Sequence, residues 1–379
     1  MRPRPAVAVL AAGVAASMAL GEFIPFLTVV GEEFALSLTT AGWLSSLITL
    51  VAGLACLPLG IWVDRRRLRG LFVAALVALG AAGVGAAFLG STEMLFAVRV
   101  IQAAGYALVV IIGPSLLVRL LEGRARQTAL ALWGLCIPAG LALANAAGSL
   151  AGAAGWRAQV AGVGLLTLGV AVLAGTLPPD SRPSRVEDHD RLGEPGAGWA
   201  VAALAAGFAM IALVGVSVVT VLPTYLMGEM RLTGSQASLL AGLVPAASML
   251  GSLAASAALR AGARPGRLIA AALLMAPLSA GVFLAAPVAV VALCAAGVLA
   301  LNGLAVSAVF AALPGVASGR VAWGVGAVTQ LGSLGTLLGP PFYGWCVEMS
   351  GWSSAIAVTA AIAAGGVGFA LAAVRRRLP

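Results

Sequence analysis

The chain has 379 residues, of which 61% are hydrophobic and only 9% are charged. A soluble domain cannot bury that much apolar surface, because the exterior of a protein in water must carry polar groups. All 22 basic residues are arginines, which excludes a Walker A phosphate loop and Schiff-base catalysis, since both need lysine. The single histidine, His189, excludes a histidine-based metal site. The net charge of +9 lies mainly in alternate loops, which indicates membrane orientation rather than a nucleic-acid partner. We also expect no cofactor.

Apolar segments of about 20 residues or more alternate with short arginine-bearing loops, as a hydrocarbon core of ~30 Å requires. Runs of Leu, Ala, Val and Gly favour helices over a barrel, whose strands would alternate in polarity. The sequence therefore predicts an all-α integral membrane protein with twelve transmembrane helices. The predicted spans are 6–30, 41–62, 70–90, 94–118, 128–151, 157–177, 199–227, 235–258, 267–286, 288–312, 321–345 and 352–374.

The first apolar segment follows Met1-Arg2-Pro3-Arg4 and continues to Val30. A cleaved signal peptide would share the basic start, but its apolar core would be shorter. We therefore expect an uncleaved first span. The cysteines lie inside apolar segments and are expected to be free thiols: Cys56, Cys136, Cys294 and Cys346.

A polar, proline-rich segment over residues 178–198 separates six predicted spans from six. We expect an N-terminal six-helix bundle over 1–177, a cytoplasmic linker over 178–198 and a C-terminal six-helix bundle over 199–379. Two dipeptides recur at similar places in the halves and favour a duplicated architecture. They are Gly155-Trp156 with Gly351-Trp352, and Leu38-Thr39 with Leu232-Thr233.

Arginines accumulate on one side of the predicted membrane, whereas the other side holds only Arg157 and Arg231. The arginine-rich side is expected to be cytoplasmic, which places both termini and the linker inside. We expect a multi-pass protein of the bacterial cytoplasmic (inner) membrane that functions as a monomer in the lipid bilayer.

The loop between spans 2 and 3 reads Gly-Ile-Trp-Val-Asp-Arg-Arg-Arg-Leu-Arg over residues 60–69. It resembles the signature Gly-x-x-x-Asp-Arg-x-Gly-Arg-Arg of the major facilitator superfamily, with Arg67 and Leu68 as departures. The resemblance implies a cytoplasmic gate, in which the glycine permits close helix approach and the charges join and release neighbouring helices. Plain positive-inside topology would explain the arginines but not the aspartate. The gate residues would be Gly60, Asp64, Arg65 and Arg69.

Two further stretches are similar to motifs of that superfamily. Arg-Val-Ile-Gln-Ala-Ala-Gly-Tyr over 99–106 resembles Arg-x-x-Gln-Gly-x-Gly, whose arginine is tied to proton coupling in related antiporters. Gly-Leu-Cys-Ile-Pro-Ala-Gly over 134–140 and the Gly/Pro pattern over 332–341 resemble the antiporter motif of spans 5 and 11. The resemblance implies two pseudo-symmetric six-helix bundles and the proton-coupled drug and metabolite antiporter branch.

Two ionisable residues lie within predicted spans, where a charge costs several kcal/mol and is a functional hypothesis by default. At ~1.5 Å per residue, Glu22 and Arg99 lie roughly 6 Å and roughly 10 Å outward from the midplane. The resemblance implies that both face a central cavity. We expect Glu22 to bind the coupling proton, because burial favours the neutral carboxyl and a nearby arginine favours the charged one. The alternatives are a static ion pair and a hydrated Glu22 at a local unwinding near Pro25.

Other polar residues fall on plausible cavity faces. Ser217, Thr220 and Thr224 repeat a helical spacing in span 7. A serine or threonine can instead bond to its own helix backbone, whereas Asn and Gln are expected to join helices or contact substrate. The predicted substrate cavity contains Gln102, Tyr106, Asn145, Ser217, Thr220, Tyr225, Asn302 and Gln330.

We predict a secondary active transporter that works by alternating access and exports small amphipathic compounds in exchange for protons. The alternative is an uptake carrier, symporter or exchanger, for a small organic or inorganic anion bound at Arg99. The sequence shows no paired carboxylates, nucleophile–base set or metal cluster of an enzyme. It also lacks the nucleotide-binding segment of a pump and the continuous polar face of a channel.

Overall fold

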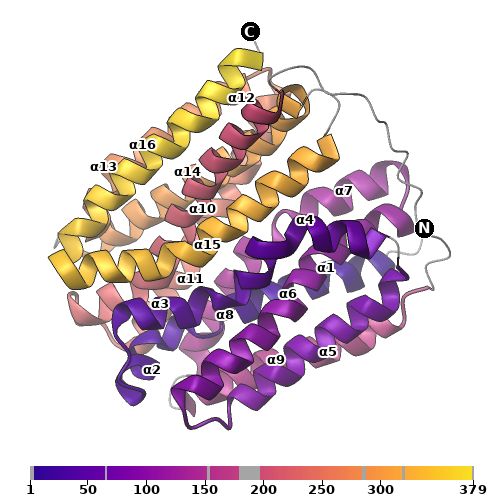
Figure 1. Ribbon diagram of the computed structural model, residues 1–379. Coiled ribbons are helices and arrows are strands. Elements are labelled where there is room, and N and C mark those ends of the chain that lie inside the picture. The colour runs from indigo at the N-terminus through magenta and orange to yellow at the C-terminus, as the bar shows by residue number, and fades with distance from the viewer. Residues whose placement is uncertain are drawn as a thin grey trace.

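The computed structural model describes residues 4–64, 66–151, 154–178, 197–283, 287–317 and 321–377. Within these ranges the regular elements are all helices, as predicted (Figure 1). Ten helical stretches are long and apolar enough to cross a membrane. The segment containing the shorter apolar helix Cys136–Ala151 and the long helix Val321–Ser350 bring the described chain to the predicted twelve spans. The predicted linker lies outside the described residues, apart from its two ends.

The first half of the chain supplies six spans, and three of them are interrupted. The first span is α1 (Arg4–Gly21), η1 (Ile24–Phe26) and α2 (Leu27–Glu33), and the second is α3 (Leu38–Ser46), η2 (Leu47–Thr49) and α4 (Leu50–Asp64). The next two are α5 (Leu68–Ala86) and α6 (Thr92–Leu120). The fifth consists of α7 (Gly123–Trp133) and α8 (Cys136–Ala151), and the sixth is α9 (Gly155–Gly175).

The second half supplies the other six spans. They are α10 (Ala197–Gly228), α11 (Gly234–Arg260), α12 (Pro265–Ala271) with η4 (Ala272–Leu274) and α13 (Met275–Phe283), α14 (Val288–Ala317), α15 (Val321–Ser350) and α16 (Trp352–Arg377). The N- and C-terminal ends of the chain lie opposite α2 (Figure 1). We call the end that holds α2 and the start of α3 the α2 end. The arginine distribution predicts that it is extracellular.

The fifth span, predicted over 128–151, is interrupted between α7 and α8. Gly134 and Leu135 make turn hydrogen bonds there, to the carbonyls of Leu130 and Leu132. The first span is also interrupted, at Glu22 and Phe23 between α1 and η1. Pro25 lacks an N–H, so it cannot donate a helical hydrogen bond to the carbonyl four residues earlier, that of Gly21.

The structure supports the duplication through equivalent turns in the two halves. Gly155 and Gly351 both have positive φ angles, 75° and 73°, and each lies at the start of a helix. Ser37 caps α3 and Thr233 caps α11, each accepting a hydrogen bond from a backbone N–H in the first turn. Both pairs are 196 positions apart, as are Thr28 and Thr224, whose hydroxyls lie 3.3 Å from each other. That contact between equivalent residues marks where the halves meet at the α2 end.

Helices in each half approach closely at small residues. In lipid the hydrophobic effect does not drive helices together, so their association depends on close van der Waals packing. A Cβ on Gly80 would lie 2.8 Å from the Gly164 carbonyl oxygen, and one on Gly207 would lie 2.6 Å from that of Gly366. Gly335 of α15 is tighter still, because its Cβ would lie 2.0 Å from the carbonyl oxygen of Ala209 in α10. Backbone atoms cannot move aside as side-chain tips can.

We therefore expect Gly335→Ala to destabilise the second half by about 1–3 kcal/mol, the usual cost of overpacking. The measurement is the thermal unfolding midpoint of purified protein in detergent. Gly368→Ala is the matched control, since a Cβ at Gly368 meets no atom within 4 Å. Equal midpoints for the two variants would contradict this packing.

Candidate functional site

The site is centred on Arg99 of α6, whose side chain is completely buried. Its Nε donates to the Leu44 carbonyl at 2.8 Å, its Nη2 to the Ser45 carbonyl at 2.9 Å and its Nη1 to the Ala19 carbonyl at 3.1 Å. These carbonyls belong to the last turns of α3 and α1, where a helix has no further N–H to offer them. The guanidinium therefore lies where the negative ends of two helix dipoles converge.

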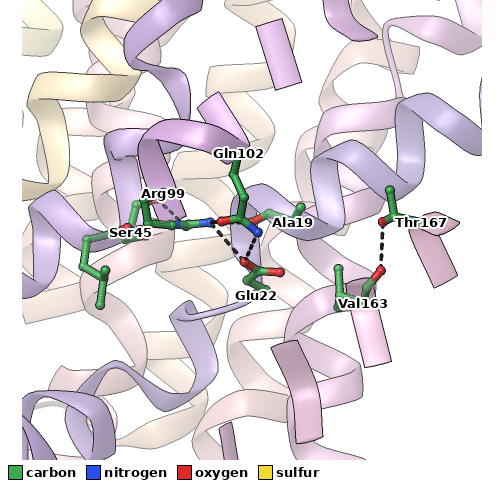
Figure 2. Close-up of polar contacts among 8 residues, drawn as sticks. Ala19, Glu22, Ser45, Arg99, Gln102, Val163 and Thr167 are labelled. Atoms are coloured by element: carbon green, nitrogen blue, oxygen red, sulfur yellow. Dashed lines mark hydrogen bonds and ion pairs between the residues drawn. The ribbon is translucent and has the colours of Figure 1, made fainter. Parts of the chain in front are cut away.

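Glu22 follows directly after α1 and is also completely buried. Its Oε1 accepts from Arg99 Nη1 at 3.1 Å and from Gln102 Nε2 at 2.9 Å. Gln102 in turn accepts from Arg99 Nη1 at 2.9 Å, which closes a three-membered network (Figure 2). The other carboxylate oxygen of Glu22, Oε2, is buried and has no hydrogen-bond partner among the described residues.

Phe23 covers the network from one side, with the Arg99 guanidinium carbon 4.9 Å from the ring centroid. This distance is within the range of a cation–π contact. The expected unwinding near Pro25 is present, since α1 ends at Gly21 and η1 begins at Ile24. The expectation of a hydrated Glu22 at that unwinding is wrong for this conformation, because its side chain has no exposed surface.

The Gly/Pro motif of span 5 lies directly behind this network. A Cβ on Gly140 would lie 2.7 Å from the Ser17 carbonyl carbon, so α8 and α1 touch through their backbones. Gly21, next to Glu22, has the Leu141 side chain 2.9 Å from its own Cβ position. The motif glycines therefore let α8 press against the end of α1 that carries the carboxylate.

Of the predicted cavity residues, Gln102 makes hydrogen bonds to Glu22 and Arg99, whereas Tyr106 is buried in the apolar core. Asn145 donates to the Leu141 carbonyl of its own helix at 2.9 Å, and its Oδ1 is buried without a partner among the described residues. Asn302 of α14 donates to the Ile211 carbonyl of α10 at 2.6 Å. It therefore joins two helices, one of the two roles expected for an amide.

The residues predicted on span 7 separate into different environments. Ser217 donates to the Leu213 carbonyl of its own helix at 2.7 Å. Thr220 is buried, and its hydroxyl has no partner among the described residues. Tyr225 packs edge-on against Phe283 and Trp352, at centroid distances of 5.5 and 5.1 Å. Tyr225 thus belongs to an aromatic cluster within the second half of the chain.

The predicted gate is only partly described. Arg65 and the Asp64 side chain lie outside what the structure describes. Arg69 donates to the Gly175 carbonyl at the end of α9, which joins the third span to the sixth. The close helix approach expected at Gly60 is wrong for this conformation, because a Cβ there would meet no atom within 4 Å.

Gln330, also predicted to line the cavity, joins two helices, which is one of the two roles expected for an amide. It bonds to backbone groups of Leu54 and Leu57 in α4. The sequence also gave no signal for the carbonyls of Ala19, Leu44 and Ser45, because backbone acceptors become available only where helices end. Among the described residues, no group of three His, Cys, Asp or Glu side chains could hold a metal ion. The four cysteines are free.

Comparison with known families gives a match to the family model described as Major Facilitator Superfamily, over residues 7–322. A search of curated protein sequences found no match. Among solved structures, the chain is similar to a bacterial homolog of the human lysosomal transporter Spinster in an inward-facing and occupied conformation. That similarity has a TM-score of 0.78, 16% identity, and coverage of 100% of this chain and 96% of the other.

Two other solved structures are similar along almost their whole lengths. A D-xylose–proton symporter gives a TM-score of 0.78 with 18% identity, covering 99% of this chain and 98% of its own. The nucleoside transporter NupG gives 0.74 with 15% identity, covering 98% and 99%. At these identities the likeness shows the shared fold.

We expect Arg99→Lys to lower the stability of the folded protein by roughly 3 kcal/mol. An ammonium offers three N–H groups from a single point and cannot reach all five acceptors, and each buried acceptor left unpaired costs ~1–3 kcal/mol. Thermal unfolding in detergent measures the loss. The exposed Arg260→Lys is the matched control. If Arg99→Lys is as stable as the control, the helix ends do not depend on the guanidinium.

Proposed function

We propose that this chain, which belongs to the major facilitator superfamily of transporters, exports small amphipathic compounds in exchange for protons that bind at Glu22. The proposal has three parts: the direction of transport, the exchange for protons and the chemical class of the transported compound. Each is supported by a different feature of the site.

The observation that carries the proposal is the unpartnered Oε2 of a fully buried Glu22. A charged carboxylate oxygen without a hydrogen bond in an apolar interior is unfavourable, and protonation relieves it. The opposing influence is Arg99 at 3.1 Å, which favours the charged carboxylate. The balance depends on the Arg99–Glu22 distance, so a movement of α1 relative to α6 would bind or release a proton.

The carbonyls at the helix ends compensate the charge of Arg99 independently of Glu22. When Glu22 becomes neutral, Arg99 still faces the carbonyls of Ala19, Leu44 and Ser45 and the amide oxygen of Gln102. The guanidinium charge therefore keeps compensation in both protonation states. A simple buried ion pair would lack this property, because removing one charge would leave the other uncompensated.

The surroundings of the network favour a cargo with few polar groups. Among the predicted cavity residues, Ser217 and Asn302 donate to backbone carbonyls, and Tyr225 faces an aromatic cluster. The unpaired side-chain atoms among these described residues are Asn145 Oδ1 and the Thr220 hydroxyl. Few side-chain hydrogen-bond groups are then left for a sugar, whereas an amphipathic molecule needs only one or two convergent polar groups. This supports small, partly hydrophobic compounds.

The alternative, an uptake carrier with Arg99 as its anion site, has less support. Five acceptors already surround the guanidinium: three backbone carbonyls, Glu22 and Gln102. An anion would have to displace them and compete with the carboxylate of Glu22. Inhibition of transport by simple carboxylates would favour this alternative.

The same proposal includes the organisation of the chain. We propose that residues 1–177 and 199–379 are the two moving bundles, joined by a cytoplasmic linker over 178–198, in a monomer with both termini inside. Its support is the equivalence of turns 196 positions apart and the contact of Thr28 with Thr224 at the interface.

Replacing Glu22→Gln should abolish transport driven by a pH gradient, because an amide cannot exchange a proton. The probe is ethidium in everted membrane vesicles, with proton release followed by acridine orange. The wild-type protein should consume the pH gradient when ethidium is added, and the variant should not. Glu93→Gln, an exposed carboxylate at the start of α6, is the control and should behave as wild type. Unchanged coupling in Glu22→Gln would overturn the proton role.

The direction of transport, export or uptake, is tested in whole bacteria that produce the protein. Cells producing the wild-type protein should accumulate several-fold less ethidium than cells producing Glu22→Gln, and a protonophore should remove the difference. Higher accumulation in cells with the wild-type protein would show uptake and refute export.

A further inference from the structure

The second and eleventh spans lie side by side and run antiparallel across the boundary between the two halves (Figure 1). Three polar contacts join them at different depths. We call these three contacts the α3–α4/α15 seam. In two of them a side chain of one helix bonds to a backbone group that a proline has freed in the other.

The middle contact lies at Pro341 of α15. Proline has no N–H, so the carbonyl four residues earlier, that of Leu337, loses its helical donor. Ser46 at the end of α3 donates to that carbonyl at 2.7 Å. A hydroxyl from the first half thus replaces the missing N–H in the second half.

The contact farther from the α2 end is the reverse arrangement, at Pro58 of α4. Pro58 leaves the Leu54 carbonyl without its helical donor. Gln330 of α15 donates to that carbonyl at 3.3 Å and accepts from the Leu57 N–H at 3.0 Å. One side-chain amide therefore bridges both backbone groups at the break in the helix.

The third contact, at the α2 end, differs in kind. Glu348 of α15 accepts from the Thr39 backbone N–H at 2.8 Å and from the Thr39 hydroxyl at 2.6 Å. Thr39 lies in the first turn of α3, where N–H groups have no intrahelical partner and the helix dipole is positive. The carboxylate of one half therefore caps a helix of the other half, and the bond is exposed.

Depth separates the roles of these contacts. Within lipid, the carbonyls of Leu54 and Leu337 have no water to replace a lost donor, so breaking those bonds is costly. At the exposed α2 end, water can hydrate Glu348 and Thr39 after they separate. Only the Glu348 contact can therefore open repeatedly at low cost.

The backbones at the α2 end are in direct contact beside this carboxylate. A Cβ on Gly344 would lie 2.7 Å from the Leu38 carbonyl oxygen, and a Cβ on Gly42 would lie 2.7 Å from the Pro340 carbonyl carbon. A cavity of about 480 Å³ opens between the helices on one side, and its lining is apolar apart from Thr39. Within the seam, the Glu348–Thr39 contact is the polar contact between these outer turns of α3 and α15. The Ser46 bond lies deeper, in the middle of the seam.

We propose that the Glu348–Thr39 contact is the latch that keeps the α2 end closed, and that the Gln330 contact at Pro58 is the pivot on which the two halves turn. The proposal rests on alternating access but not on proton binding at Glu22. A failure of Glu22→Gln to uncouple transport would leave it intact.

The test measures opening directly and needs no substrate. The four native cysteines are replaced by serine, and nitroxide labels are placed at Gly90→Cys and Glu229→Cys, in opposite halves at the α2 end. Double electron–electron resonance in lipid nanodiscs then gives the distance distribution. Glu348→Gln should raise the ratio of long to short distances about tenfold, since a charge-assisted hydrogen bond is lost. Gly344→Ala should raise it independently, by forcing the two backbones apart.

Three control variants separate the latch from other effects. Glu32→Gln removes an exposed carboxylate at the same end, and Gly85→Ala adds a methyl where no atom lies within 4 Å; both should leave the distribution unchanged. Gln330→Leu should lower the unfolding temperature without changing the distance ratio, because a pivot is kept in both states. An unchanged distribution in both Glu348→Gln and Gly344→Ala would overturn the latch. A shift in Gln330→Leu would overturn the pivot.

Discussion

The interaction on which the rest of the structure depends is the contact between the Arg99 guanidinium and the carbonyl ends of two interrupted helices. A buried arginine needs several acceptors, and a continuous membrane helix has none to spare. The breaks after α1 and α3 expose those acceptors at one depth. Glu22 lies within the first break, directly after α1, so the same interruption that binds the arginine also positions the carboxylate. The helix ends give the guanidinium acceptors that do not depend on the charge of the carboxylate.

The chemistry belongs to one half of a duplicated chain. The turns at Gly155 and Gly351 match across 196 positions, yet at that offset Glu22 and Arg99 correspond to Val218 and Ala295. The second half therefore contributes an apolar surface and the seam partners, while the first half contributes the charged network. In the proposed mechanism the proton therefore binds within the first half. The N-caps Ser37 and Thr233 begin equivalent helices in the two halves, although the charged network is present in the first half alone among the described residues.

The membrane spans and the charged network could be predicted from the sequence, whereas the contacts between helices could not, for a physical reason. Hydropathy and arginine placement fix spans because the bilayer has a set thickness. Glu22, Arg99 and Gln102 could be identified because charged and amide side chains within membrane spans are costly and therefore rare without a function. The partners of Gln330 and Tyr225 could not be predicted, because an amide or an aromatic residue in a span does not reveal which helix lies opposite it. The backbone acceptors of Arg99 were missed because they exist only where helices end.

The central claim is that Glu22 changes protonation while Arg99 remains charged. It is tested most directly by infrared difference spectroscopy of the protein in lipid bilayers, titrated with acid and base, following the C=O stretch of a protonated carboxyl. We expect the difference between the wild-type and Glu22→Gln titrations to contain a C=O band that titrates, with the guanidinium bands unchanged in intensity. The other acidic side chains contribute equally to both titrations and cancel in the difference. A difference without a titrating C=O band would contradict the claim.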